Sequence, residues 1–285
     1  MISHFFAIIG AYYLILLSFS ACISSKYELF INVTSPRVTL AITPKFTFSN
    51  DNFLSFSIDK LKNLCYNTMI LLILGVYMEI ISLKPTGFSS NSFLIVSGNE
   101  AFAVDPSISE TVILRELESR SLKLRGILLT HGHFDHIWKL KELREKTGVP
   151  VYVHELDAEM LTDSQKNAYS AFMYGDFSVG EADVLLRDAD VLTLGDEQLT
   201  VIHTPGHTKG SVCFDTGDSL ITGDTLFAEG FGRYDLYGGD LDALKTSLKM
   251  LCEMAERERK WLLAGHGEPS TLKSATQSLK YYFDF

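Results

Sequence analysis

Short apolar runs and amphipathic segments alternate along the chain from Met78 to the C-terminus. The apolar runs are rich in Val, Ile, Leu and Phe and are bounded by Gly, Pro or Asp, which is typical of strands. The predicted strands are Met78–Leu83, Ser92–Val96, Ala101–Val104, Gly126–Leu129, Val151–Val153, Val184–Leu186, Val191–Leu194, Leu199–His203, Ser211–Phe214, Ser219–Thr222 and Trp261–Ala264. Apolar positions at helical spacing, with caps and stops, indicate helices. The predicted helices are 107–119 (capped by Ser107 or Ser109), 137–147, 241–258 and 271–283.

This order of elements predicts an α/β domain over residues 78–285. One stretch, 163–182, fits neither period, because Asn167, Gly175 and Gly180 interrupt it. A long loop in a compact domain is typical of a lid or a specificity element. We therefore expect residues 163–182 to lie near the functional site.

The first 77 residues are a different kind of sequence and have no assigned domain. The uncharged apolar run 5–23 is about long enough to cross a bilayer, but no Lys or Arg precedes it as in a signal peptide. Residues 26–64 are polar and show no sustained helical or strand period. Two interpretations remain open: a membrane anchor or export signal in 5–23, or a gene-model artefact with translation starting at Met78. The second implies a cytoplasmic protein.

Charge and cysteine content narrow the class of partner. The formal net charge of −10 is unlike that of a nucleic-acid-binding domain, so we expect a small-molecule substrate and no nucleic-acid partner. The four cysteines are widely spaced and predict reduced, mostly buried thiols rather than a disulfide framework. Neither feature indicates an oligomeric state.

The strongest chemical signal is Thr130–His136, which reads Thr-His-Gly-His-Phe-Asp-His and follows the apolar run Gly126–Leu129. Open α/β sheets bind ligands beyond the carboxyl ends of their strands. Imidazole and carboxylate suit zinc or another first-row transition metal. Three histidines and an aspartate exceed what one tetrahedral ion needs, so this stretch predicts two ions.

Three later strands end in the same way, with Gly beside a metal-ligating residue: Gly206-His207, Gly223-Asp224 and Gly265-His266. Each pair alone is more typical of an ordinary loop. Together with Thr130–His136, however, these strand ends hold five of the eight histidines. We therefore expect one site. Of the remaining histidines, His154 and His203 are expected to be satisfied by neighbours at strand ends, with His203 also placed to support His207.

This order of residues resembles the metallo-β-lactamase superfamily. The phrases Thr-Pro-Gly-His-Thr-Lys-Gly-Ser (204–211), Gly-Asp-Thr-Leu-Phe (223–227) and Gly-Arg-Tyr-Asp-Leu (232–236) are similar to those of its small glyoxalase II-like, or hydroxyacylglutathione hydrolase-like, members. The resemblance runs from about Met78 to the C-terminus. Trp138-Lys139 departs from it, because many relatives have Gly-Gly there, and this change should alter the helix start and the wall of the site.

The resemblance implies a four-layer αβ/βα sandwich with a dinuclear metal site at one edge of the two sheets. The expected ions are zinc, with iron or manganese as alternatives. The implied metal ligands are His131, His133 and His207 for the first ion, Asp135, His136 and His266 for the second, and Asp224 as a bridge.

Other residues take supporting roles by the same resemblance. Asp105 corresponds to a buried acid behind the ligands, and Asp135 and Asp224 are the implied catalytic carboxylates. Arg233 and Tyr234 are local candidates for substrate contact. Alternatively, Arg233 and Asp235 brace their own loop.

The implied reaction is attack by a metal-bound hydroxide on an activated carbonyl, with a thioester of the hydroxyacylglutathione type as the favoured substrate. Its thiolate leaves without needing much protonation. One alternative is an iron-dependent persulfide dioxygenase or another oxygen-using relative of the fold. The other is a membrane-anchored, non-catalytic metal-binding module, although structural zinc sites are closed by four ligands and seven are present here.

We expect the native protein to begin at Met78, where organised sequence starts. Intact-mass measurement of the protein purified from its natural source should give the mass of residues 78–285. A species that retains residues before Met78 would contradict this expectation.

Overall fold

A computed structural model of the protein describes residues 27–34, 37–44, 78–85, 87 and 89–284. The chain divides into two compact units, Met1–Gly75 and Val76–Phe285. The first contains an antiparallel pair of strands, β1 (Tyr27–Thr34) and β2 (Arg37–Pro44). The pair forms although residues 26–64 show no sustained strand period, because backbone hydrogen bonds between adjacent segments form a ladder without strict polar alternation.

The apolar run 5–23 lies outside the described residues, so its role as an anchor stays a prediction. In the part of the chain that the structure describes, no helix combines the length and the apolar character needed to cross a bilayer.

Two six-stranded mixed sheets form the centre of the second unit. The first has the order β3 (Glu79–Leu83), β4 (Ser92–Ser97), β5 (Glu100–Val104), β6 (Lys123–Leu128), β7 (Val151–His154) and β8 (Val184–Leu186). The second has the order β14 (Ser270–Thr271), β13 (Trp261–Ala264), β12 (Ser219–Gly223), β11 (Val212–Asp215), β10 (Glu197–His203) and β9 (Val191–Leu194). Strands β5 to β8 are parallel to one another, as are β12 and β13.

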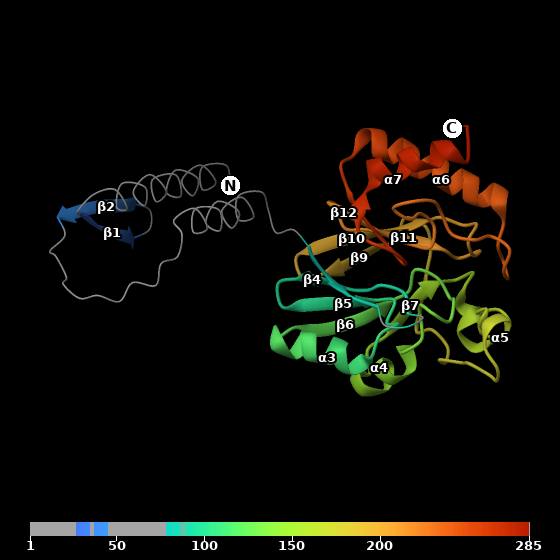
Figure 1. Ribbon diagram of the computed structural model, residues 1–285. Helices are drawn as coiled ribbons and strands as arrows, with labels where there is room; N and C mark the ends of the chain where they lie inside the picture. The colour runs from blue at the N-terminus through green and yellow to red at the C-terminus, as the bar shows by residue number, and fades with distance from the viewer. Residues whose placement is uncertain (1–26, 35–36, 45–77, 86, 88, 285) are drawn as a thin grey trace. The chain divides into compact units, whose positions relative to one another are not determined.

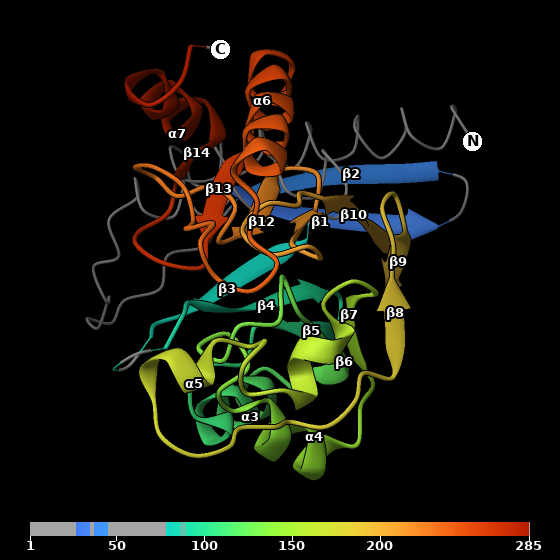
Figure 2. The same cartoon turned by 90° about the vertical axis from the view of Figure 1, so that its right-hand side faces the viewer.

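Helices cover the outer face of each sheet. α3 (Glu110–Ser119) and α4 (Leu140–Thr147) lie against the first sheet, and α6 (Leu241–Arg257) and α7 (Leu272–Ser278) lie against the second (Figures 1 and 2). The other helical elements among the described residues are η1 (Ala158–Thr162), α5 (Tyr169–Phe172) and η2 (Leu279–Tyr281). The predicted four-layer αβ/βα sandwich is therefore confirmed.

Buried apolar side chains fill each of the three spaces between these layers. Ile113 and Leu143 belong to the cluster under α3 and α4, and Leu248 belongs to the cluster under α6 and α7. Between the two sheets, Phe93 and Phe102 of the first meet Phe214 of the second. This central layer holds the sheets in the relative position on which any site across their edges depends.

Two predicted helices begin or end elsewhere than expected. α4 begins at Leu140 rather than at 137, because residues 134–139, which include Asp135 and His136, form tight turns. The last predicted helix is interrupted: Thr271 caps α7 by accepting a hydrogen bond from the Ser274 N–H, and the chain then tightens into η2. The long stretch 163–182 is irregular as predicted, except for the short α5.

Replacing Phe214 by Ala should lower the free energy of unfolding by about 3–5 kcal/mol, because the ring is fully buried between the two sheets. Urea unfolding of the full chain measures the change. Tyr281→Ala, at a highly exposed ring, is the control and should change this energy by less than about 0.5 kcal/mol. Equal losses in the two variants would contradict the inter-sheet placement.

Candidate metal centre

Strands from both sheets deliver the predicted site residues to one edge of the sandwich. β6 of the first sheet leads into the loop with His131 and His133, and β10 of the second leads into the loop with His207. The parallel strands β12 and β13 end beside each other and are followed by Asp224 and His266. The Val212 N–H donates to the Thr130 carbonyl (2.9 Å), which ties the two sheets together here.

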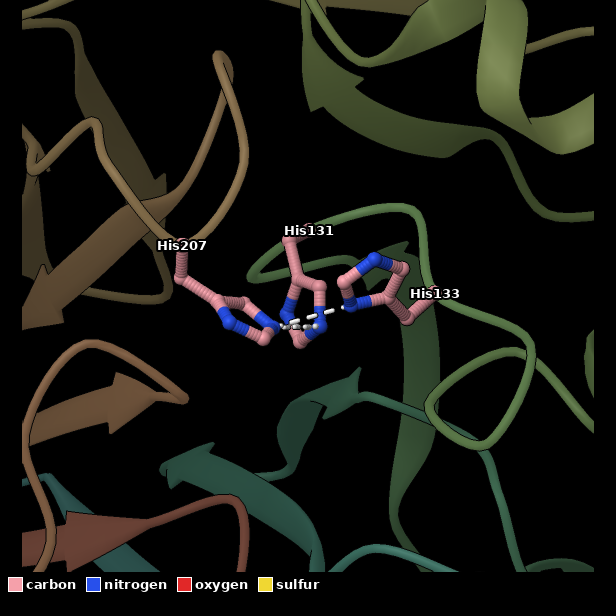
Figure 3. A group of neighbouring side chains, drawn as sticks. All are labelled: His131, His133 and His207. Atoms are coloured by element: carbon pink, nitrogen blue, oxygen red, sulfur yellow. Dashed lines mark hydrogen bonds between the residues drawn. The ribbon is translucent and has the colours of Figure 1, made fainter. Parts of the chain in front are cut away.

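Three imidazoles converge in the inner half of the cluster. His207 Nε2 lies 2.9 Å from His133 Nδ1 and 3.2 Å from His131 Nε2 (Figure 3). All three side chains are buried. The structure therefore brings together, from two sheets, the residues that the sequence groups around the first ion.

The outer half of the cluster contains Asp135, His136 and His266. His266 Nε2 lies 3.1 Å from Asp135 Oδ2, and His136 Nε2 lies 3.9 Å from the same oxygen. Whereas His136 is buried, the His266 side chain is 40% exposed. This half of the cluster is open to solvent.

Asp224 lies between the two halves. Its Oδ1 is 3.2 Å from His136 Nε2, and its Oδ2 is 3.6 Å from His266 Nε2 and 3.7 Å from His207 Nε2. One carboxylate thus faces donors of both groups, as a bridging ligand must.

The geometry of these atoms fits divalent metal ions. A tetrahedral zinc ion with ligands at about 2.0–2.1 Å separates its donor atoms by about 3.3 Å, close to the separations observed. His136 Nε2 and Asp224 Oδ1 are also buried, and neither makes a hydrogen bond of suitable geometry within the described residues. Buried polar atoms of this kind are costly without a partner, and a cation between them supplies one.

Asp105 lies behind the cluster and orients His136. Its Oδ2 accepts hydrogen bonds from His136 Nδ1 (2.8 Å) and the Thr130 hydroxyl (2.6 Å), and its Oδ1 accepts from the Thr130 N–H (2.8 Å). The bond to Nδ1 leaves Nε2 facing Asp224. Asp105 has φ 47°, an uncommon conformation for a residue other than glycine, which these three bonds hold in place.

Backbone groups and close approaches fix the other ligand loops. His207 Nδ1 donates to the Arg233 carbonyl (2.6 Å), so that Nε2 points into the cluster. A Cβ atom on Gly265 would collide with Asp224 Oδ1 and with the His136 ring. Glycine is therefore required at 265 because the backbone passes directly against the site.

The electrostatics separate the inner histidines, whose pKa values are lowered, from His136, whose pKa is raised. Burial lowers the pKa of His131 and His207, and it lowers the pKa of His133 to about 3. Burial also acts to lower the pKa of His136, but Asp224, Asp105 and Asp135 outweigh it and raise that pKa well above its ordinary value.

The two carboxylates of the cluster stay ionised for a matching reason. Burial acts to raise the pKa of Asp224 and of Asp135, but nearby histidines, His136 foremost, outweigh it and lower both pKa values. Three neutral imidazoles beside two negative carboxylates form a donor set that favours divalent cations.

Asp157 is a buried residue of the site that sequence reasoning missed. It follows β7, and its carboxylate accepts hydrogen bonds from the Gly132 N–H (3.1 Å), the Gly210 N–H (2.7 Å) and the Thr208 hydroxyl (2.7 Å). Gly132 separates His131 from His133, and Thr208 follows His207. Asp157 therefore joins the two loops that carry the inner histidines.

The turn before β4 makes a second connection that sequence reasoning missed. The Ser90 N–H donates to the Asp135 carbonyl (3.1 Å), and the Asn91 N–H donates to the Gly265 carbonyl (2.7 Å). The Asn91 side-chain amide also donates to the carbonyls of Ala264 and Gly267 (2.9 Å each). No local pattern marks these residues, because single polar residues are common in loops.

The remaining predicted residues lie around the cluster. Arg233 pairs with Asp235 through two hydrogen bonds (2.7 and 2.8 Å), which favours the interpretation that it braces its own loop. Tyr234 is exposed. His203 bonds the Lys209 carbonyl (2.8 Å) and stacks on His154 at 4.1 Å, so these two histidines are satisfied by neighbours as expected.

Comparison with known proteins places this geometry in a family. A profile described as the metallo-beta-lactamase superfamily matches residues 85–266, a range that contains every residue of the cluster. The chain is similar to the probable metallo-hydrolase YqgX of Bacillus subtilis (strain 168), with 35% identity over 187 residues, 64% of this chain and 88% of the relative.

The chain is also similar to two proteins whose names state a substrate or a bound metal. The chain is 32% identical over 179 residues to a hydroxyacylglutathione hydrolase of Pelagibacter ubique (strain HTCC1062), covering 61% of this chain and 65% of the relative. It is also similar to a crystal structure of TTHA1623 in a di-iron-bound form. That match has a TM-score of 0.61 and 29% identity and covers 70% of this chain and 98% of the other.

Asp157→Asn should remove one pH-dependent part of the stability. Burial raises the pKa of Asp157 to about 6, although its three hydrogen bonds act to lower it. An unfolded aspartate titrates near about 3.9, so the native state binds the proton more tightly. The wild-type free energy of unfolding should therefore fall as pH rises from about 4 to about 6, by up to about 3 kcal/mol from this group.

Urea unfolding of metal-free protein across this pH range tests the expectation. The difference between wild type and Asp157→Asn should vary with pH, whereas Asp218→Asn, at an exposed aspartate, should follow wild type throughout. Parallel curves for wild type and Asp157→Asn would show that Asp157 does not carry the proton.

Proposed function

The chain belongs to the metallo-β-lactamase superfamily, and on that premise we propose that it is a metal-dependent hydrolase of activated carbonyl compounds, acting on a thioester of the hydroxyacylglutathione type. The observation that carries the proposal is Asp224, whose carboxylate faces both halves of a seven-residue donor cluster. Of the three groups of potential ligands in the described residues, two share His131 and two share His136. Such sharing supports a pair of ions rather than one closed structural site.

The proposed first ion would be held by His131, His133 and His207, the second by Asp135, His136 and His266, and both by Asp224. Bound divalent metals supply Lewis acidity and lower the pKa of a coordinated water towards neutrality. The residues of the chain supply orientation: Asp105 and the Arg233 carbonyl hold two of the imidazoles in the tautomer that presents Nε2.

The proposed role of Asp135 is to orient the nucleophilic water. Its carboxylate is partly exposed on the open side of the cluster, and it is ionised because the neighbouring His136 and His266 favour the charged form. An ionised carboxylate accepts the hydrogen bond of a water and aligns its lone pair towards a carbonyl carbon. Asp224 is less exposed, and its two oxygens face a donor of the outer half and a donor of the inner half.

A thioester is favoured over an amide or a phosphodiester on chemical grounds. The thiolate is a good leaving group and needs little protonation, and the site as described relies on no separate general acid for the leaving group. The similarity to a hydroxyacylglutathione hydrolase supports this choice. The net charge of −10 supports a small-molecule substrate over nucleic acid. Tyr234, exposed on the loop after Gly232, is the proposed substrate contact, with Arg233 beside it.

An alternative function depends on which metal the site binds. The similarity to a di-iron protein supports iron as well as zinc at this donor set. An iron-bound form could act as an oxygen-using enzyme, such as a persulfide dioxygenase. Metal analysis of the purified protein, combined with oxygen consumption in the presence of a persulfide, separates this alternative from hydrolysis.

His133→Ala should reduce thioester hydrolysis by at least about a thousandfold, because it removes one of the inner donors while the two sheets keep their core. Hydrolysis of a hydroxyacylglutathione, metal content and circular dichroism measure activity, metal and fold separately. The matched control is His203→Ala, a histidine whose ring stacks on His154 instead of entering the cluster. The control should retain activity and metal. Undiminished turnover by metal-free His133→Ala would refute the proposed chemistry.

A further inference from the structure

An aromatic wall stands beside the metal centre. Its five rings belong to Phe134, Trp138, Tyr169, Phe172 and Phe177. Phe177 stacks almost parallel on Trp138 (centroids 5.5 Å apart, 12°) and on Tyr169 (5.1 Å, 15°). Phe134 packs edge-on against Trp138 and Tyr169. Trp138, where the sequence departs from many relatives, thus contributes one ring to this aromatic group.

Hydrogen bonds around Asn167 hold the wall in position. The Asn167 carbonyl accepts from the Phe134 N–H (3.0 Å), its side-chain oxygen accepts from the Tyr169 N–H (3.0 Å), and its amide donates to the Phe177 carbonyl (3.2 Å). Asn167 is fully buried. The stretch 163–182 therefore carries an ordered surface, and ordered surfaces bind at a smaller entropic cost.

Phe172 is the most exposed ring of the wall, and it contacts side chains from two loops that border the site. Its centroid lies 6.0 Å from that of Phe134, which separates His133 from Asp135 in the sequence. The Arg233 guanidinium lies 5.6 Å from the Phe172 ring, and the Arg233 carbonyl holds His207. Phe172 thus packs between the Phe134 ring of the metal-ligating loop and the Arg233 side chain, whose backbone holds His207.

Phe172 is the most exposed ring of the wall. Phe134 is buried and Trp138 is 36% exposed, whereas Phe172 is 54% exposed. Arg233, its cationic neighbour, is paired with Asp235, so the charge beside the ring is neutralised. The free surface of Phe172 is therefore apolar, rigidly supported and adjacent to the loop that carries Asp135.

We propose that the exposed surface of Phe172 binds the acyl group of the substrate. This inference rests on the thioester hydrolysis proposed above and departs from it in the acyl group, which is uncharged, apolar and larger than acetyl, such as hexanoyl or phenylacetyl, instead of a short hydroxyacyl group. An acyl carbon close to Asp135 places its apolar chain against the wall. Burial of that chain on an aromatic ring is favourable, whereas an acetyl group is too short to use the surface.

The test compares acetyl, hexanoyl and phenylacetyl thioesters of N-acetylcysteamine with the metal-loaded full chain. Wild type should show a kcat/KM at least about tenfold higher for the two larger substrates. Phe172→Ala should lose about tenfold on these through KM and change less than about twofold on acetyl. Phe172→Leu should retain most of the activity on hexanoyl. Tyr174→Ala, at a fully exposed ring in the same stretch, is the matched control and should behave as wild type.

A binding measurement provides a readout that does not depend on turnover. The Kd of the non-hydrolysable thioether S-hexyl-N-acetylcysteamine should be about tenfold weaker in Phe172→Ala than in wild type or Tyr174→Ala, with equal metal content in all three. Calorimetric titration measures the Kd, and the fluorescence of Trp138, a member of the wall, provides a second signal.

The outcomes separate this inference from the proposed function. If wild type hydrolyses thioesters without preferring larger acyl groups, or if Phe172→Ala weakens all substrates equally, the acyl-binding role is overturned and the hydrolase function stands. If the thioether binds in a Phe172-dependent way but no thioester is hydrolysed, the apolar surface stands and the proposed hydrolase function is wrong.

Discussion

Inside the edge of this sandwich, the nitrogens of His131, His133 and His207 face one another at separations of 2.9 and 3.2 Å. Buried imidazoles with lowered pKa values are neutral, so each offers a nitrogen lone pair that can bind a cation lying between them. The surrounding structure follows from the need to hold these groups together. Two sheets must end at the same place, their loops must be tied to one another, and negative charge must balance bound metal.

The fold meets these needs with a small number of buried polar contacts. Asp105 orients His136 from behind, at the cost of an uncommon backbone conformation. Asp157 joins the loop of His131 and His133 to that of His207, and Asn91 joins the turn before β4 to the loop of His266. Each of these side chains links segments far apart in the sequence. Together they let one metal centre form from both sheets.

The two halves of the cluster differ in exposure, so a substrate can approach from one side. The inner histidines are buried, whereas Asp135 and His266 face solvent. The aromatic wall that ends in Phe172 borders the same region, because Phe134 lies within the metal-ligating loop itself. A reactive carbonyl at the open half would therefore have polar groups on one side and apolar rings on the other. This division supports a hydrolase that recognises its substrate through the acyl group.

The sequence by itself determined the class of fold and the residues that gather at the site. Short apolar strands, each followed by Gly and a histidine or aspartate, are local signals, so Thr130–His136, His207, Asp224 and His266 could be grouped before their geometry was known. Only the tertiary structure decided that Asp157 accepts hydrogen bonds from two loops, that α4 begins at Leu140, and that Phe172 packs against Phe134 of the metal-ligating loop. These features depend on contacts between distant segments, where a single aspartate or phenylalanine has no periodicity to mark it. Its role arises from what the fold places next to it.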